Sequence, residues 1–210
     1  MNASRALRGL TVLAVVAALT ACSAPEHTFV ASPEADLVLK LPRSWSTVRN
    51  ETSASGVTGR PDGGWTAVFD AAHDPDAKHV DLNTSVKAPV AFAKVTVLDS
   101  DGATAMNGDK LRDIMLPFTA AARTQFAGDA RVKTFQKISD YDVRSPVASG
   151  VHVVYSYDLG HGREVFDQIA MVGSRKSRVY MLVVRSDEAS YESRKAQIAE
   201  IMKSFTVKVP

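Results

Sequence analysis

The sequence has almost no cysteine. Cys22 is the only cysteine among 210 residues, so the chain can form no internal disulfide. Any folded domain of this chain must therefore be stabilised by packing and hydrogen bonding alone. About 175 residues follow the N-terminal region, which is enough for one domain with a sizeable hydrophobic core.

An excess of charge of either sign is also missing. The chain has 25 Lys and Arg against 23 Asp and Glu. Arg5 and Arg8 lie in an N-terminal segment that we expect to be removed, and without them the two signs balance. A neutral domain offers no electrostatic basis for binding nucleic acid or anionic lipid. We therefore expect no nucleic-acid partner.

No apolar run is long enough to cross a membrane. The longest, residues 10–21, has about a dozen residues, whereas a spanning helix needs roughly 20. Arg5 and Arg8 precede this run, and the small residues Thr20 and Ala21 end it. A basic start, a short apolar core and small residues at its end are typical of a secretory signal.

The residue after this signal is Cys22, and Leu19-Thr20-Ala21-Cys22 resembles the lipobox of bacterial lipoproteins. In that family a thioether-linked diacylglycerol is built on the cysteine before cleavage. The resemblance implies a lipoprotein signal peptide at 1–21, lipid attachment at Cys22, and a location at the cell membrane on its extracytoplasmic side. A plain cleaved signal with an incidental cysteine is the alternative.

Residues 22–36 carry prolines and small residues with little apolar periodicity, which predicts a lipidated tether. Flexible-chain scaling gives such a tether a reach of roughly 20 Å. Residues 37–210 are predicted to form a single α+β globular domain. The membrane, contacted through the lipid anchor, is thus the first expected partner.

The domain shows strand-like and helix-like segments in a simple order. Alternation of apolar and polar residues predicts strands, and apolar residues at three- and four-residue spacing predict helices. Residues 50–64, rich in Ser, Thr and Gly, predict a mobile loop. The expected strands are 37–41, 65–69, 90–98, 132–143 (bent), 151–157, 164–172 and 178–185, and the expected helices are 111–126 and 188–203.

Pro117 lies inside the first helical pattern and must kink or restart that helix. The last three strands are joined by tight turns, at 158–162 and 173–177, which predicts an antiparallel meander. Two amphipathic helices need an apolar sheet face to cover. The sequence therefore predicts an α+β fold with an antiparallel sheet of about six to seven strands and two main helices.

Two segments carry a resemblance to a known group. The opening at 39–45, where Pro42 ends a strand and Trp45 follows, and the close at 178–184 and 203–207 resemble the Mog1/PsbP-like proteins, and within them the LpqN-type lipoproteins of actinobacteria. The resemblance implies an α/β/α sandwich. It also implies a non-catalytic protein that binds other proteins or envelope components.

No residue pattern indicates catalysis, a cofactor or a closed metal motif. No serine lies in a Gly-x-Ser-x-Gly elbow, and no glycine loop of the phosphate-binding kind is present. Two clusters remain as candidate ion sites. A solvated polar loop explains the first more simply, and an Asp-Gly turn before a helix explains the second. The first consists of Asp70, His73, Asp74, Asp76, His79 and Asp81, and the second of Asp99, Asp101, Asn107 and Asp109.

Aromatic residues could line an apolar pocket or fill the core. They are Trp45, Trp65, Tyr155, Tyr157 and Phe166. His152, on the face of its strand that carries Val154 and Ser156, could occupy a pocket, the surface or a core position where its nitrogens are satisfied.

These observations favour a membrane-anchored, non-catalytic extracytoplasmic lipoprotein that binds a protein partner or an envelope lipid or small ligand. The alternative is an extracytoplasmic metal-dependent enzyme or hydrolase that uses the loop with His73 and His79. A solute receptor of a transporter is disfavoured, because such receptors usually have two lobes and this chain has length for one.

Overall fold

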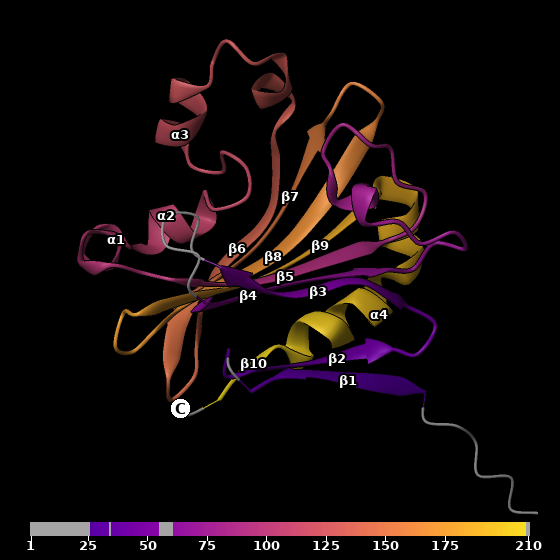
Figure 1. Cartoon of the computed structure of the whole chain (residues 1–210). Coiled ribbons are helices and arrows are strands. Elements are labelled where there is room, and N and C mark those ends of the chain that lie inside the picture. Colours follow the sequence, from indigo (N-terminus) through magenta and orange to yellow (C-terminus); the bar gives the residue numbers. More distant parts are fainter. Residues whose placement is uncertain (1–25, 34, 55–60, 209–210) are drawn as a thin grey trace, which may run out of the picture.

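The computed structural model describes residues 26–33, 35–54 and 61–208. The predicted signal peptide, 1–21, and Cys22 lie outside the described residues. The described residues form two antiparallel sheets with helices on both faces of the larger one (Figure 1), which confirms the predicted α+β class. Within them, none of the helices has the length and apolar character that a membrane span requires.

The larger sheet has seven strands in the order β3-β4-β5-β9-β8-β7-β6. Every neighbouring pair in it is antiparallel. The last three strands in sequence form the expected meander, and Gly160 and Gly162 supply the positive φ angles of its first turn. The strands are β3 (Ser46–Ala54), β4 (Pro61–Asp70), β5 (Val90–Val97), β6 (Gln136–Arg144), β7 (Ala148–Asp158), β8 (Arg163–Gly173) and β9 (Arg178–Asp187).

The smaller sheet consists of β1 (His27–Ser32), β2 (Leu37–Pro42) and β10 (Thr206–Val207), with β2 in the middle. The structure differs here from two of the sequence-based predictions. The strand predicted at 37–41 belongs to this second sheet, and β1 lies inside the segment predicted as a tether. Residues 27–32 lack a clear apolar alternation, because the buried Ser32 is polar and the apolar Phe29 is exposed, so that only Val30 marks the core-facing side.

One face of the seven-stranded sheet is covered by α4 (Glu188–Ser204), as the sequence predicts. The Asp187 side chain accepts a hydrogen bond from the Ser190 backbone N–H and caps the helix. Figure 1 shows α4 lying between the large and the small sheet. The buried residues of the helix pack with both sheets in one core, and they are Tyr191, Ile198, Ile201 and Met202.

The other face is covered by short helices. The helical pattern over 111–126 is interrupted around Pro117, as the sequence predicts, but it forms two short helices with a longer gap between them than expected. Each of the helices begins at a side-chain cap, and Pro117 lies between two of them, because proline has no N–H for an α-helical hydrogen bond. The segment comprises α1 (Ser100–Ala105), α2 (Gly108–Arg112), α3 (Ala120–Gln125) and the 3₁₀ turn η2 (Ala130–Thr134), with caps Asp99, Asn107, Thr119 and Asp129.

Two further expectations need correction. The loop predicted at 50–64 is largely a hairpin, because β3 pairs with β4 along Ser46–Ala54 despite its polar sequence. An edge strand takes its hydrogen bonds from its neighbour and needs no apolar alternation of its own. The bent strand predicted at 132–143 is η2 followed by β6, with a register shift between Lys137 and Ser139. A second 3₁₀ turn, η1 (Ala77–Val80), lies between β4 and β5.

Candidate functional site

A groove lies along the β6 edge of the sheet, on the face that α4 covers. Its volume is about 510 Å³, within the range of ligand sites in proteins. We call it the α4 groove. Side chains of three strands, the C-terminal half of α4 and β10 form it. Its apolar lining includes Val143, Val154, Ile169, Met171, Ala199, Met202, Phe205 and Val207.

A chain of hydrogen bonds runs from this groove into the core. The Tyr141 hydroxyl contacts His152 Nδ1, and His152 Nε2 lies 2.6 Å from Asp167 Oδ1. The Tyr191 hydroxyl of α4 donates to the other oxygen of Asp167 at 3.0 Å. Asp167 is 5% exposed, whereas Tyr141 is 50% exposed. The chain therefore connects a buried carboxylate with a phenol that solvent or a ligand can reach.

Burial keeps both phenols of this chain protonated. Desolvation and the nearby Asp167 charge raise the pKa of Tyr141, and the same two causes raise the pKa of Tyr191 further. In the neutral imidazole, Nε2–H donates to Asp167 and Nδ1 accepts from Tyr141. A phenol with a raised pKa is a poor nucleophile at neutral pH. Both phenols are therefore protonated at neutral pH and can take part in hydrogen bonds.

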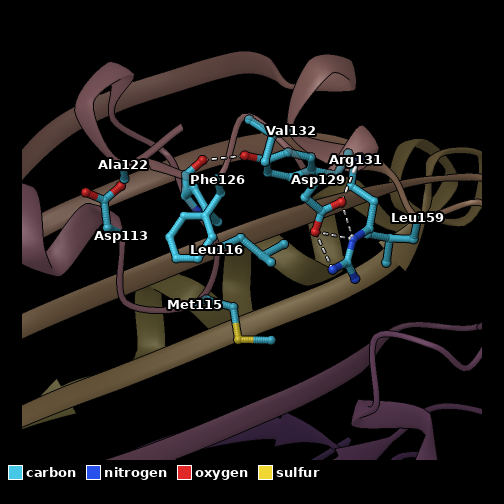
Figure 2. Close-up of a pocket in the computed structure, with 11 residues that line it drawn as sticks. Asp113, Met115, Leu116, Ala122, Phe126, Asp129, Arg131, Val132 and Leu159 are labelled. Atoms are coloured by element: carbon cyan, nitrogen blue, oxygen red, sulfur yellow. Dashed lines mark hydrogen bonds and ion pairs between the residues drawn. The ribbon is translucent and has the colours of Figure 1, made fainter. Parts of the chain in front are cut away.

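A second hollow, which we call the α3 pocket, lies on the opposite face, beneath the short helices (Figure 2). Its volume is about 280 Å³. Figure 2 shows Met115, Leu116 and Phe126 on one side of it and the Asp129–Arg131 pair on the other. Arg131 makes side-chain hydrogen bonds to both carboxylate oxygens of Asp129. This pair lowers the pKa of the Asp129 carboxyl and raises that of Arg131.

Hydrogen bonds and ring contacts attach the short helices to the sheet around the α3 pocket. The Tyr157 hydroxyl donates to the Pro117 carbonyl oxygen. The fully buried Gln168 donates to the Leu111 carbonyl at 2.9 Å and accepts from Tyr155 at 3.1 Å. An aromatic cluster completes the attachment, made by Phe118, Phe135, Tyr155, Tyr157 and Phe166, with the Arg123 guanidinium 4.1 Å from the centre of the Phe135 ring.

The loop after β4 does not assemble the predicted ion site. Asp70 is fully buried, accepts from the backbone of Ala72 and Asp76, and lies 2.6 Å from His79 Nδ1. The side chain of His73 is almost fully exposed, with Asp74 3.7 Å away. Among the described residues, no three His, Cys, Asp or Glu side chains are grouped as metal ligands. Asp70 thus organises the loop through hydrogen bonds.

Sequence reasoning missed the pair that attaches this loop to the sheet. Arg185 on β9 and Glu164 on β8 are both nearly buried and form an ion pair. The guanidinium also donates to the carbonyl oxygens of His79, Asp81 and Thr84. The available signal was a charged residue near one end of each strand, Glu164 at the start of β8 and Arg185 near the end of β9, beside residues that read as core.

The other candidates also have structural roles. Asp99 caps α1, and Asn107 caps α2, which is the turn-and-helix alternative to a calcium loop. All five candidate aromatics are buried, and they lie on opposite faces of the sheet. Trp45 and Trp65 belong to the α4 side, whereas Tyr155, Tyr157 and Phe166 belong to the short-helix side, with Tyr157 also lining the α3 pocket.

Of the candidates predicted from sequence, His152 is therefore the one that lies in the α4 groove and takes part in its chain of hydrogen bonds. Sequence reasoning did not find its partners Tyr141, Asp167 and Tyr191. The register of β6 with β7 places Tyr141 directly opposite His152, and Asp167 on β8 lies opposite Val154. That register is a property of the sheet and cannot be seen in residue spacing.

Comparisons with known proteins place the chain only by fold. No protein-family model matches the sequence, and no curated protein is significantly similar to it. Solved structures similar to this chain include the PsbP protein of the cyanobacterium Synechocystis sp. PCC 6803, with 12% identity, a TM-score of 0.49, and coverage of 91% of this chain and 98% of that one.

Another similar structure is the Ran-binding protein Mog1p of Saccharomyces cerevisiae, with 11% identity, a TM-score of 0.46, and coverage of 86% of this chain and 95% of that one. Mog1- and PsbP-type structures are thus among the fold neighbours of this chain. At such identities and TM-scores, the likeness concerns the fold and supports no statement about activity or partners.

Proposed function

We propose that this chain is a lipid-anchored extracytoplasmic protein that binds an envelope lipid or a small amphiphilic ligand in the α4 groove without transforming it. The observation that carries the proposal is the combination found in that groove. An apolar lining of suitable volume ends at a phenol, an imidazole and a carboxylate that converge from three strands. Ligand sites combine an apolar wall with a few placed polar groups in this way.

The membrane location in this proposal rests on the sequence. Leu19-Thr20-Ala21-Cys22 has the form of a lipobox, and Cys22 is the predicted attachment site. The anchor would hold the groove close to the lipids it is proposed to bind. Two acyl chains on one cysteine suffice for stable anchoring, since each buried methylene contributes about 0.8 kcal/mol.

Membership of the LpqN-type lipoproteins is part of the same proposal. The opening segment lies beside residues 203–207 of the closing segment, and the Lys40 backbone N–H donates to the Ser204 hydroxyl at 2.9 Å. Residues 178–184 belong to β9 of the large sheet. Leu37 and Val38 of β2 pair with Val207 and Thr206 of β10, so the opening strand and the closing strand are neighbours.

An enzyme that uses His73 and His79 is the second candidate, and the Asp70–His79 pair is the observation in its favour. The binding function has more support, because Asp70 already accepts two backbone hydrogen bonds and His73 points into solvent. If His73→Ala and His79→Ala both leave the biological phenotype intact in folded protein, the enzyme hypothesis is excluded.

The test of the binding function fills the groove from its exposed side. Ala199 lines the groove and is exposed on α4, so Ala199→Trp should obstruct the groove without disturbing the core. Ala196→Trp, exposed on the same helix and not among the lining residues, is the matched control. The full acylated chain is purified from its membrane in mild detergent, and native mass spectrometry identifies co-purified lipid.

We expect the parent chain and Ala196→Trp to carry non-covalent lipid. Ala199→Trp should carry at least tenfold less lipid per protein than the parent chain. If the parent chain carries no such lipid while a crosslinker placed at the groove captures a protein, the ligand is a protein partner. Equal lipid content in all three forms would overturn the assignment of the groove.

A further inference from the structure

The short distance between Cys22 and the first strand restricts how the domain can lie on a membrane. β1 begins at His27, five residues after Cys22. Five residues span at most about 18 Å even when fully extended. The sequence-based tether of fifteen residues would have allowed the domain to tumble freely. With β1 paired to β2 along its whole length, that freedom is lost.

The small sheet has one face in the core and one face outward. Leu37, Leu39 and Leu41 of β2 are buried in the core that contains α4. Side chains alternate across a strand, so the neighbouring residues of β2 and their partners on β1 share the opposite face. In the register of the sheet, Phe29 lies opposite Lys40, and Ala31 lies opposite Val38.

This outward face carries an apolar side chain that the core does not use. Phe29 is 69% exposed, the largest exposure among the large apolar residues described as exposed. Ala31 is exposed beside it, and Val38 is half-buried. Figure 1 shows β1 as the outermost strand, with α4 on the inner side of the small sheet. No described element covers Phe29 from outside.

We infer that the outward face of the small sheet rests on the bilayer, with Phe29 in the interfacial region of the lipid. The inference depends on the lipid anchor of the proposed function and adds the orientation of the domain. The anchor brings this face within reach of the headgroups, and an exposed aromatic ring gains free energy by leaving water for the interface. The balanced charge of the chain without 1–21 means that this contact needs no anionic lipid.

The lack of a second cysteine makes the inference easy to test. Cys22 is consumed by acylation, so Phe29→Cys introduces a single thiol for an environment-sensitive NBD label. Ile138→Cys, at a 51% exposed position on β6, is the control at the far edge of the large sheet. The full acylated chain is reconstituted into phosphatidylcholine vesicles, and quenching by iodide in water is compared with quenching by spin-labelled lipid.

We expect a blue-shifted NBD emission and at least threefold weaker iodide quenching at position 29 than at position 138. An Ala31→Cys label on the same face should behave like position 29, which guards against disturbance by loss of the Phe29 ring. Insertion of ten Gly and Ser residues between Ser23 and Ala24 should restore iodide access at position 29 while the protein stays bound.

Vesicle flotation distinguishes a failure of the proposed lipid anchor from a failure of the proposed orientation. If the acylated chain does not float with vesicles, or its mass shows no acyl groups, the lipid anchor itself fails. If the chain floats but positions 29 and 138 are equally open to iodide, the anchor stands and the proposed orientation is wrong. Protection at position 29 that persists in detergent, without lipid, would assign this face to a protein contact and would also overturn the inference.

Discussion

The two faces of the seven-stranded sheet are covered in different ways. On one face a single helix of 17 residues, α4, fills the space between two sheets with a continuous apolar core. On the other face three short helices and a 3₁₀ turn each begin at a side-chain cap, and hydrogen bonds and ring contacts join them to the sheet. A long amphipathic helix can close a core by itself, whereas short helices leave gaps, and the α3 pocket is such a gap.

The two faces should also contribute differently to the stability of the domain. Buried residues of α4 contact both sheets, so their loss is felt across the whole domain. Apolar residues of the short-helix side include Phe126, which is 54% exposed beside the α3 pocket. An apolar side chain that stays more than half exposed contributes less to folding than one that is buried.

The largest expected difference is between Ile201 and Phe126. Ile201→Ala removes a side chain that is 2% exposed and should lower the free energy of unfolding by about 3 kcal/mol. Phe126→Ala should change it by less than about 0.5 kcal/mol. Urea unfolding followed by tryptophan fluorescence measures both. Equal losses would show that the two faces are stabilised alike and would remove the basis of the comparison.

A smaller effect is expected at the attachment of the short helices. Gln168→Leu deprives the Tyr155 hydroxyl and the Leu111 carbonyl of their partner, which should cost about 2 kcal/mol. Hydrogen exchange should accelerate in α2 more than in α4. Gln125→Leu, an identical change at an exposed position, should have no such effect. Uniform acceleration in both helices would contradict a local attachment.

The smallest effect is a pH dependence on the short-helix side. Burial raises the pKa of Tyr157 to about 12, above its value near 10 in the unfolded chain. The folded protein therefore retains this proton where the unfolded chain has lost it. The resulting stability is fully present below pH 10 and is lost as the pH rises through about 12.

Tyr157→Phe serves as the matched variant for this measurement. The difference in unfolding free energy between the parent chain and Tyr157→Phe should be constant from pH 8 to 10. Above pH 10 the parent chain should lose on the order of 1 kcal/mol relative to the variant. Urea midpoints taken at successive pH values give the difference directly. A difference that stays constant to pH 11.5 would mean that the phenol is not shielded from water.

Periodicity predicted the regular parts of this fold well. The helix at 188–203 and the meander of β7, β8 and β9 have patterns strong enough to identify from residues alone. A break at Pro117 was predicted, but the short lengths of α2 and α3 were not, because apolar residues continue one helical pattern across the proline. Their boundaries depend on the capping side chains and on contact with the sheet, and a window of sequence weighs neither.

The candidate site was predicted less well than the fold. The sequence left His152 open between a pocket, the surface and the core, and it offered the His73–His79 loop as the site of the alternative enzyme hypothesis. The structure gives Asp70 of that loop backbone partners and places His152 in the groove. The histidines and acids of the loop after β4 are close in sequence, but the side chains that form hydrogen bonds in the structure do so within the loop itself. The attachment of Cys22 to lipid stays a prediction from sequence, and it lies outside the residues that the structure describes.

The sequence by itself determined the α+β class and the positions of its long elements, because alternation and helical periodicity are local consequences of burying one side of a strand or helix. Only the tertiary structure decided which polar groups meet. Tyr141, His152, Asp167 and Tyr191 come from four elements, and strand register and helix packing bring them together. The same holds for Phe29, since pairing of β1 with β2 converts part of a predicted tether into an outward face near the anchor.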